Sequence, residues 1–205
     1  MKTTWAILAA LVLGAAVSSA RAAQYSIMAL TAPPTLEATD GPGVSYELGT
    51  KFQSDVAGQI LALRYWQPAL ETGSHLGNLW TSSGTLLESV AFSNEAAGWM
   101  QATLATPVNI QAGSIYVVSV NANVYYADTD FGLSNSLVNG PIHTIADNDN
   151  GVFSQPPDTF PTDVFNNTNY YRDVVFQPAV VPEPATIGML ALGGVLLVRR
   201  RRGVK

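Results

Sequence analysis

The sequence predicts an all-β domain, an antiparallel β-sandwich of the jelly-roll or immunoglobulin-like type. Runs rich in β-branched and aromatic residues, such as 59–66 and 114–120, have the composition of strands. No stretch of residues 23–177 shows the apolar period of an amphipathic helix, about 3.6 residues. Turn residues recur about every 8 to 15 positions, as in sandwiches and barrels, at Gly58, Gly73 to Gly77, Gly84, Gly98 and Gly113.

The strands can be placed in order along the chain. Residues 59–66 form the first strong strand, and a hairpin follows around Ser82-Ser83-Gly84. After the alternating run 99–104, the β-branched run 114–120 is expected at the centre of a sheet. Residues 128–160 are rich in Asn, Asp, Ser and Pro and predict long loops with one or two short strands, before a last strand at 170–176.

The N-terminus predicts a signal peptide over residues 1–22. A lysine precedes Ala6–Val17, an apolar run of 12 residues that is too short to span a bilayer. Small residues follow, so we expect a signal helix and cleavage after Ala22, with Ala20 or Ala23 as alternatives. The other interpretation is an N-terminal membrane anchor.

Three further segments follow the signal peptide. Residues 23–44 predict an extended lead, because Pro33-Pro34 and Gly41-Pro42-Gly43 interrupt any long element. Residues 45–177 are expected to form the β-sandwich. Residues 178–205 predict a linker followed by a hydrophobic helix, the apolar run 185–198 of 14 residues, which is short for a membrane span.

This C-terminal tail resembles the PEP-CTERM sorting signal. A proline-acid-proline motif, an apolar segment and an arginine cluster occur in that order, at Pro182, Glu183, Pro184, Arg199, Arg200, Arg201 and Arg202. The resemblance implies export across the inner membrane of a Gram-negative bacterium, processing by an exosortase-type membrane enzyme and association with extracellular polysaccharide. Before processing, the helix would hold the protein in the membrane with the arginines on the cytoplasmic side. An ordinary tail anchor is the alternative.

Residues 45–177 also resemble an uncharacterised family of secreted bacterial β-domains. The blocks that carry the resemblance include 47–52, 72–80, 107–113 and 170–176, in that order. Relatives stand alone or beside sugar-active and adhesive modules. The resemblance implies a β-sandwich and an extracellular setting, and it supplies no catalytic residues.

The charge of residues 23–177 excludes nucleic acid and anionic lipid as partners. Lys51, Arg64 and Arg172 are the basic residues of this segment, against 14 acidic ones, which leaves a balance of −11. Cysteine is absent, so thiol catalysis and cysteine metal sites are excluded too.

Four tyrosines are the best ligand candidates. Tyr125, Tyr126, Tyr170 and Tyr171 form two adjacent pairs, and on a regular strand one ring of each pair faces away from the core. An exposed ring can stack on a sugar, although packing in the core is the ordinary role of aromatic residues on strands.

Other candidate sites are weaker. His75 and His143 could each act as a base, but no Gly-x-Ser-x-Gly motif accompanies them, and His75 is expected to shape a turn. Asp128 and Asp130 share one face of a strand and could form a glycosidase carboxylate pair. Asp147 and Asp149 resemble the start of a calcium loop, and calcium is the one cofactor considered.

We therefore expect an exported, non-catalytic protein of the cell surface or extracellular matrix that associates with exopolysaccharide. The alternatives are a secreted glycan hydrolase that uses a carboxylate pair, and a calcium-stabilised adhesion module.

Overall fold

The structure is a computed structural model that describes residues 23–28, 35–145 and 149–179. This part of the chain is all-β, and none of it forms a helix that could cross a membrane. The strands are β1 (Thr35–Ala38), β2 (Tyr46–Ser54), β3 (Gly58–Gln67), β4 (Leu76–Thr81), β5 (Leu86–Ala91), β6 (Gly98–Ile110), β7 (Tyr116–Ala122), β8 (Tyr126–Asp128), β9 (Val138–Asn139), β10 (Ile142–Thr144), β11 (Gly151–Ser154), β12 (Asp163–Val164) and β13 (Arg172–Pro178). The expected signal helix and C-terminal hydrophobic helix lie outside the described residues.

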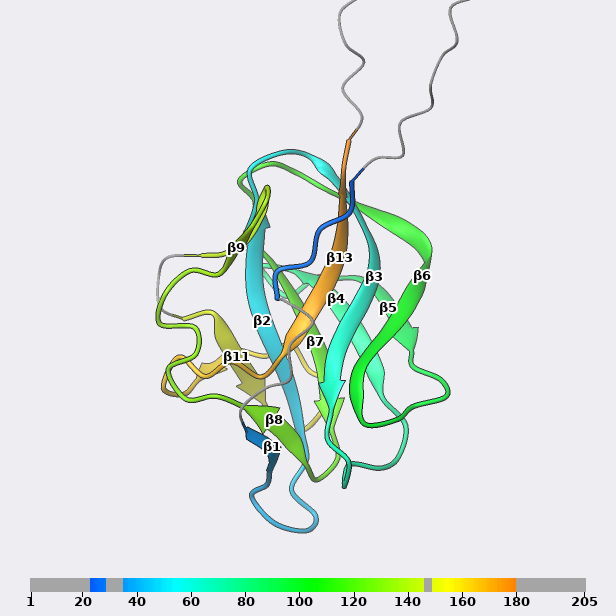
Figure 1. Ribbon diagram of the computed structural model, residues 1–205, viewed down its shortest axis with the longest axis vertical. Helices are drawn as coiled ribbons and strands as arrows, with labels where there is room; N and C mark the ends of the chain where they lie inside the picture. The colour runs from blue at the N-terminus through cyan, green and yellow to red at the C-terminus, as the bar shows by residue number, and fades with distance from the viewer. Residues whose placement is uncertain (1–22, 29–34, 146–148, 180–205) are drawn as a thin grey trace, which may run out of the picture.

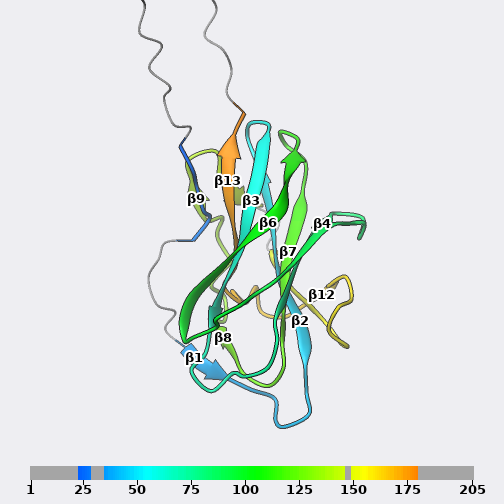
Figure 2. The same cartoon turned by 90° about the vertical axis from the view of Figure 1, so that its right-hand side faces the viewer.

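Two antiparallel sheets pack face to face, which confirms the predicted β-sandwich (Figures 1 and 2). One sheet has the order β13-β3-β6. The larger sheet runs β12-β11-β2-β7-β4-β5, and the β9-β10 hairpin pairs with β2 as well. A small third sheet joins β1 to β8 at one end of the sandwich (Figure 1).

The main core lies between these two sheets. Leu63 of β3 and Val174 of β13 come from one sheet, whereas Phe52, Leu79 and Val118 come from the other, and all five are fully buried. Such complete burial of apolar side chains stabilises each strand by about 1.5–3 kcal/mol per large residue. The run 114–120 was rich enough in valine to indicate a central strand, and β7 does lie between β2 and β4.

The expectation of one or two short strands in residues 128–160 is wrong. The segment holds β9, β10 and β11, and the last two pair with β2, as in His143 opposite Gln53 and Val152 opposite Gly49. Ile142 and Val152 are fully buried. Their strands are so short that the surrounding Asn and Asp residues dominate the composition of the segment.

The residues before the sandwich take part in it. Tyr25 pairs with Phe176 through two backbone hydrogen bonds of 2.8 Å, on the side of β13 that faces away from β3. The side chains of Ile27 and Met28 enter the main core, and Asp173 accepts the N–H of Ile27 at 2.9 Å. Both ends of the described chain therefore lie together at the end of the sandwich opposite β1 and β8 (Figure 1).

Candidate functional site

An open pocket lies at the end of the sandwich that carries β1 and β8. Its volume is about 190 Å³, and five of its seven lining residues are aromatic. The strands β2, β8 and β11 and the segment before β13 each contribute one or two of them (Figure 1). The lining residues are Asp40, Tyr46, Leu48, Tyr126, Phe153, Phe165 and Tyr170.

The aromatic rings of the pocket stand nearly perpendicular to one another. The ring of Tyr46 meets that of Tyr126 at 6.1 Å and 85°, and that of Phe153 at 5.9 Å and 84°. Tyr126 meets Tyr170 at 6.2 Å and 72°. Edge-to-face pairs of this kind are favoured by the ring quadrupole, so the walls of the pocket support one another.

The turn between β12 and β13 sets the positions of Phe165 and Tyr170. Asn166 and Asn167 both have left-handed backbone angles, φ 48° and 49°, which asparagine tolerates better than most residues. The backbone of Asn169 pairs with Thr129 through two hydrogen bonds of 3.0 Å. As a result Tyr170 is buried beneath the pocket, whereas Phe165 stays 54% exposed at its side.

Asp40 is the acidic residue of the pocket. It is exposed, and one of its oxygens accepts the hydroxyl proton of Tyr126 at 2.8 Å. Burial, and then this carboxylate, raise the pKa of Tyr126 and of Tyr46 above the ordinary value. Burial and the nearby acidic groups also raise the pKa of Tyr170 to about 12. The tyrosines are therefore neutral at physiological pH.

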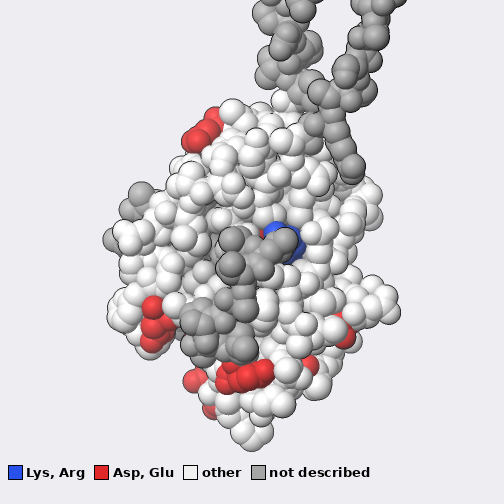
Figure 3. All heavy atoms as spheres, viewed as in Figure 1, with Lys and Arg blue, Asp and Glu red and all other residues white. Residues whose placement is uncertain are grey.

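Among the residues that the structure describes, no basic side chain lines this pocket. The guanidinium of Arg172 is buried and donates to the carbonyl oxygen of Tyr170 at 2.6 Å. Arg64 pairs with Asp173, and Lys51 lines a different pocket. On the face shown in Figure 3, the acidic atoms of the described residues appear at several separate places and basic atoms at one.

The four candidate tyrosines do not all meet. Tyr126 and Tyr170 line the pocket, one from each adjacent pair. Tyr171 packs against the main core, and its hydroxyl lies 2.7 Å from that of Thr129. Tyr125 is half-buried and does not line the pocket. Sequence reasoning missed Asp40, Tyr46, Phe153 and Phe165, which carry no local signal.

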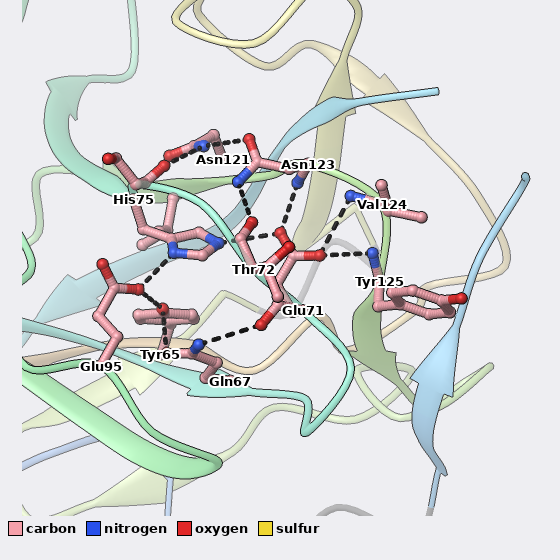
Figure 4. Close-up of polar contacts among 12 residues, drawn as sticks. Tyr65, Gln67, Glu71, Thr72, His75, Glu95, Asn121, Asn123, Val124 and Tyr125 are labelled. Carbon is pink, nitrogen blue, oxygen red and sulfur yellow. Dashed lines mark hydrogen bonds and ion pairs between the residues drawn. The ribbon is translucent and has the colours of Figure 1, made fainter. Parts of the chain in front are cut away.

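A buried polar cluster surrounds His75 and reaches the residues that precede β8 (Figure 4). His75 is 2% exposed and lies between two carboxylates: its Nε2 is 2.9 Å from Glu71, and its Nδ1 contacts Glu95. Glu95 also accepts the hydroxyl proton of Tyr65 at 2.5 Å. Both ring nitrogens can donate to these oxygens only in the doubly protonated imidazolium.

Glu71 links this cluster to the start of β8. Its carboxylate accepts the backbone N–H groups of Asn123, Val124 and Tyr125 at 2.6, 3.1 and 2.7 Å (Figure 4). Burial opposes ionisation of Glu71, but the hydrogen bonds from His75 and from these three N–H groups outweigh it and lower its pKa. The cluster thereby fixes the segment that leads into Tyr126.

The remaining candidate residues are scattered. His143 lies at the far end of β2, 3.2 Å from Asp55. Asp128 ends β8, and burial followed by the charges of Asp130 and Asp40 raises its pKa. Asp130 lies beyond the strand and accepts the hydroxyl proton of Thr168 at 2.9 Å.

The proposed calcium loop is only partly visible. Asp147 lies outside the described residues, and Asp149 is exposed. Asn150 is buried, and its side-chain amide bonds both the N–H and the C=O of Ile145, which closes this loop. Among the residues that the structure describes, no three His, Asp or Glu side chains gather as a metal site would require.

The described residues form an all-β domain of the sandwich class, with an open aromatic pocket at one end. Residues 31–172 match the family described as Domain of unknown function (DUF4082), and the chain belongs to it. Residues 180–202 match the PEP-CTERM protein-sorting motif. The motif indicates exosortase-dependent export and a location in the envelope or at the surface of a bacterial cell. No curated protein matches the chain.

Proposed function

We propose that this protein is a non-catalytic component of the cell surface or extracellular matrix of a Gram-negative bacterium, and that it binds extracellular polysaccharide through the aromatic pocket. The tail supports the association with exopolysaccharide, because the sorting signal that it resembles implies such an association. The pocket supports the binding of sugar, because aromatic faces in an open concave site can stack on sugar rings.

The observation that carries the proposal is the convergence of tyrosine and phenylalanine rings on one open pocket. Tyr46, Tyr126 and Tyr170 come from parts of the chain that are far apart in sequence, and the fold brings them together with Phe153. The 54% exposure of Phe165 leaves a large apolar surface in water beside them. An exposed aromatic at the edge of a pocket is typical of a binding surface.

The position of the pocket also suits this role. Strand β2 begins at Tyr46 in the pocket and ends at Ser54, near which the backbone of Ala179 bonds to Ala57. At roughly 3.3 Å per residue, the strand separates the two ends by about 26 Å. The sorting tail follows Ala179, so the pocket lies at the end of the domain away from the tail.

Affinity electrophoresis tests the proposal. The full-length secreted protein is run through gels that contain the extracellular polysaccharide of the bacterium that makes it, and we expect its migration to be retarded. Phe165→Ala removes one exposed ring of the pocket and is expected to weaken the retardation about tenfold or more, the scale of one aromatic stack. Leu86→Ala removes a similarly exposed side chain on β5 and serves as the matched control. Equal migration with and without polysaccharide would contradict the proposal.

One observation favours a hydrolytic alternative. Asp128 is half-buried and has a raised pKa, as a general acid in a glycosidase needs. Release of reducing ends from the same polysaccharide, abolished by Asp128→Asn, would support the hydrolase and contradict the non-catalytic role.

A further inference from the structure

We propose that the pocket recognises a protonated amine, so that the polysaccharide bound contains amino sugars with free amino groups. This inference rests on the proposed function and names its ligand class. It is drawn from the shape and the charge of the pocket, which favour a cation over a neutral sugar, and from its size, which limits the ligand to a small group.

The walls form a box rather than a platform. Tyr46 stands at 85° to Tyr126 and at 84° to Phe153, so these lining rings do not share one plane and do not form a single flat surface. A neutral pyranose uses its flat face and is best served by one broad ring surface. A compact cation instead gains from several ring faces at once, because each face carries negative quadrupole density.

An acidic group lies in the same pocket. Asp40 is exposed, and its carboxylate is oriented by the hydroxyl of Tyr126 at 2.8 Å. A carboxylate has four lone-pair sites, so its bond to Tyr126 leaves other sites that can accept from an ammonium group. An aromatic box with a carboxylate beside it has the chemistry that binds ammonium ligands.

The surroundings make the potential more negative. Asp128 and Asp130 lie near enough to raise the pKa of Tyr170 in addition to burial. Asp40 and Asp130 both contribute, after burial, to the raised pKa of Asp128. No described lining residue is basic, and Arg172, which donates to the carbonyl oxygen of Tyr170, is buried rather than exposed in the pocket. Since a focused field of one sign attracts the opposite charge, the site favours a cation over a neutral group of the same size.

The size limits the ligand to one sugar residue or one head group. The volume of about 190 Å³ is smaller than the roughly 300 Å³ at which pockets for drug-sized ligands begin. One amino sugar, held by its amine between the rings and Asp40, fits this space, while the rest of the polymer continues into solvent. The openness of the site at this end of the domain allows the chain to leave it.

Isothermal titration calorimetry of the full-length protein tests the inference. The probes are short oligomers of glucosamine and of N-acetylglucosamine of equal length, at about pH 6, where an amine that titrates near pH 8 is protonated. We expect the glucosamine oligomer to bind about tenfold more tightly, the scale of a desolvated cation–π contact. Acetylation removes the charge and leaves the ring, so the comparison isolates the amine.

Two variants distinguish the effect of the pocket's carboxylate on amine binding from the effect of the domain's net negative charge. Asp40→Asn is expected to remove most of the preference for glucosamine. Asp55→Asn removes the same charge at the far end of β2, where its side chain is 68% exposed, and is expected to keep it. Thermal melting of both variants checks their folding. If Asp40→Asn fails to fold, Phe165→Ala replaces it, with the expectation that the glucosamine oligomer loses more affinity than the acetylated one.

The outcomes are distinct. Equal binding of the two oligomers, or a preference that Asp55→Asn reduces as much as Asp40→Asn, overturns the inference and leaves the proposed function standing. Binding of tetramethylammonium without binding of either oligomer overturns the amino-sugar assignment. If the protein binds neither oligomer and does not bind the native polysaccharide, both the inference and the proposed function are wrong.

Discussion

Oε1 of Glu71 lies 2.9 Å from Nε2 of His75 in the interior of the domain. The two residues are four positions apart in the turn before β4. The same carboxylate holds the backbone of residues 123–125, so one acidic side chain connects two loops that are far apart in sequence. The pocket depends on this connection because Tyr126 follows directly.

Glu71→Gln tests the connection. The amide keeps one acceptor oxygen, but its NH2 group would face either the backbone N–H groups of residues 123–125 or the ring of His75, and the negative charge between them is lost. We therefore expect the free energy of unfolding to fall by about 3 kcal/mol. Urea denaturation measures it, with Glu88→Gln on the surface of β5 as the control. A loss below about 0.5 kcal/mol, the size of an ordinary surface change, would show that Glu71 does not hold the loops together.

Gly151→Ala is expected to damage the pocket side of the larger sheet. A β-carbon at this position would overlap the carbonyl oxygen of Thr168, so β11 has to move away from the turn that carries Tyr170. We expect a loss of about 3 kcal/mol or more, measured by thermal or urea unfolding. At Gly43 a β-carbon would meet open space, and only the φ of +84° is unfavourable for alanine. Gly43→Ala should therefore lower the free energy of unfolding by only about 1 kcal/mol. Equal costs for the two variants would contradict the packing at Gly151.

Asp173 predicts a pH dependence of stability. Burial raises the pKa of Asp173 to about 6, although Arg64 lies 3.3 Å away and opposes the shift. The folded state therefore binds this proton more tightly than the unfolded chain, in which aspartate titrates near pH 4. The contribution of the protonated carboxyl to stability is complete below about pH 4 and is lost as the pH rises through about 6.

The comparison of wild type with Asp173→Asn isolates this effect. The free energy of unfolding of the wild type, relative to that of the variant, is expected to fall by about 3 kcal/mol between pH 4 and pH 7. Urea denaturation at intervals across this range measures it. The Glu88→Gln variant on β5 serves as the control, and an equal slope for both variants would rule out burial of Asp173 as the cause.

Processing of the tail can be measured directly. Mass spectrometry of the protein recovered from the cell surface is expected to show a C-terminus near Pro182-Glu183-Pro184 and no Arg199 to Arg202. Substitution of both prolines by alanine should leave the arginines in place. Native protein that still ends at Lys205 would argue against exosortase cleavage of this chain.

The sequence predicted the sandwich because its strands carry their own signals. Val117, Val118 and Val120 marked β7, and the turn at Ser82-Ser83-Gly84 marked the β4-β5 hairpin. One or two short strands were expected in residues 128–160, but the positions of β10 and β11 could not be assigned, because three or four residues between polar loops are too few to show a period. Only their pairing with β2 makes them strands.

The pocket was half predictable. Tyr126 and Tyr170 were among the four tyrosines that the sequence singled out, but neither adjacent pair lies on a regular strand, and Tyr170 is buried in a core cluster rather than turned away from it. Asp40, Tyr46 and Phe153 could not be found, because their meeting depends on register: Phe153 lies opposite Leu48 on β2, which places it beside Tyr46. The buried partners of His75 depend in the same way on contacts between distant loops.

The pairing of Tyr25 with Phe176 has a consequence for the order of events during export. The first described segment of the body covers the outer edge of its last long strand, so neither can reach its final place until nearly the whole body has crossed the membrane. Residue 178 ends β13, and the sorting motif begins only a few positions later. Completion of the sandwich therefore has to wait until the residues just before the sorting motif are available to pair.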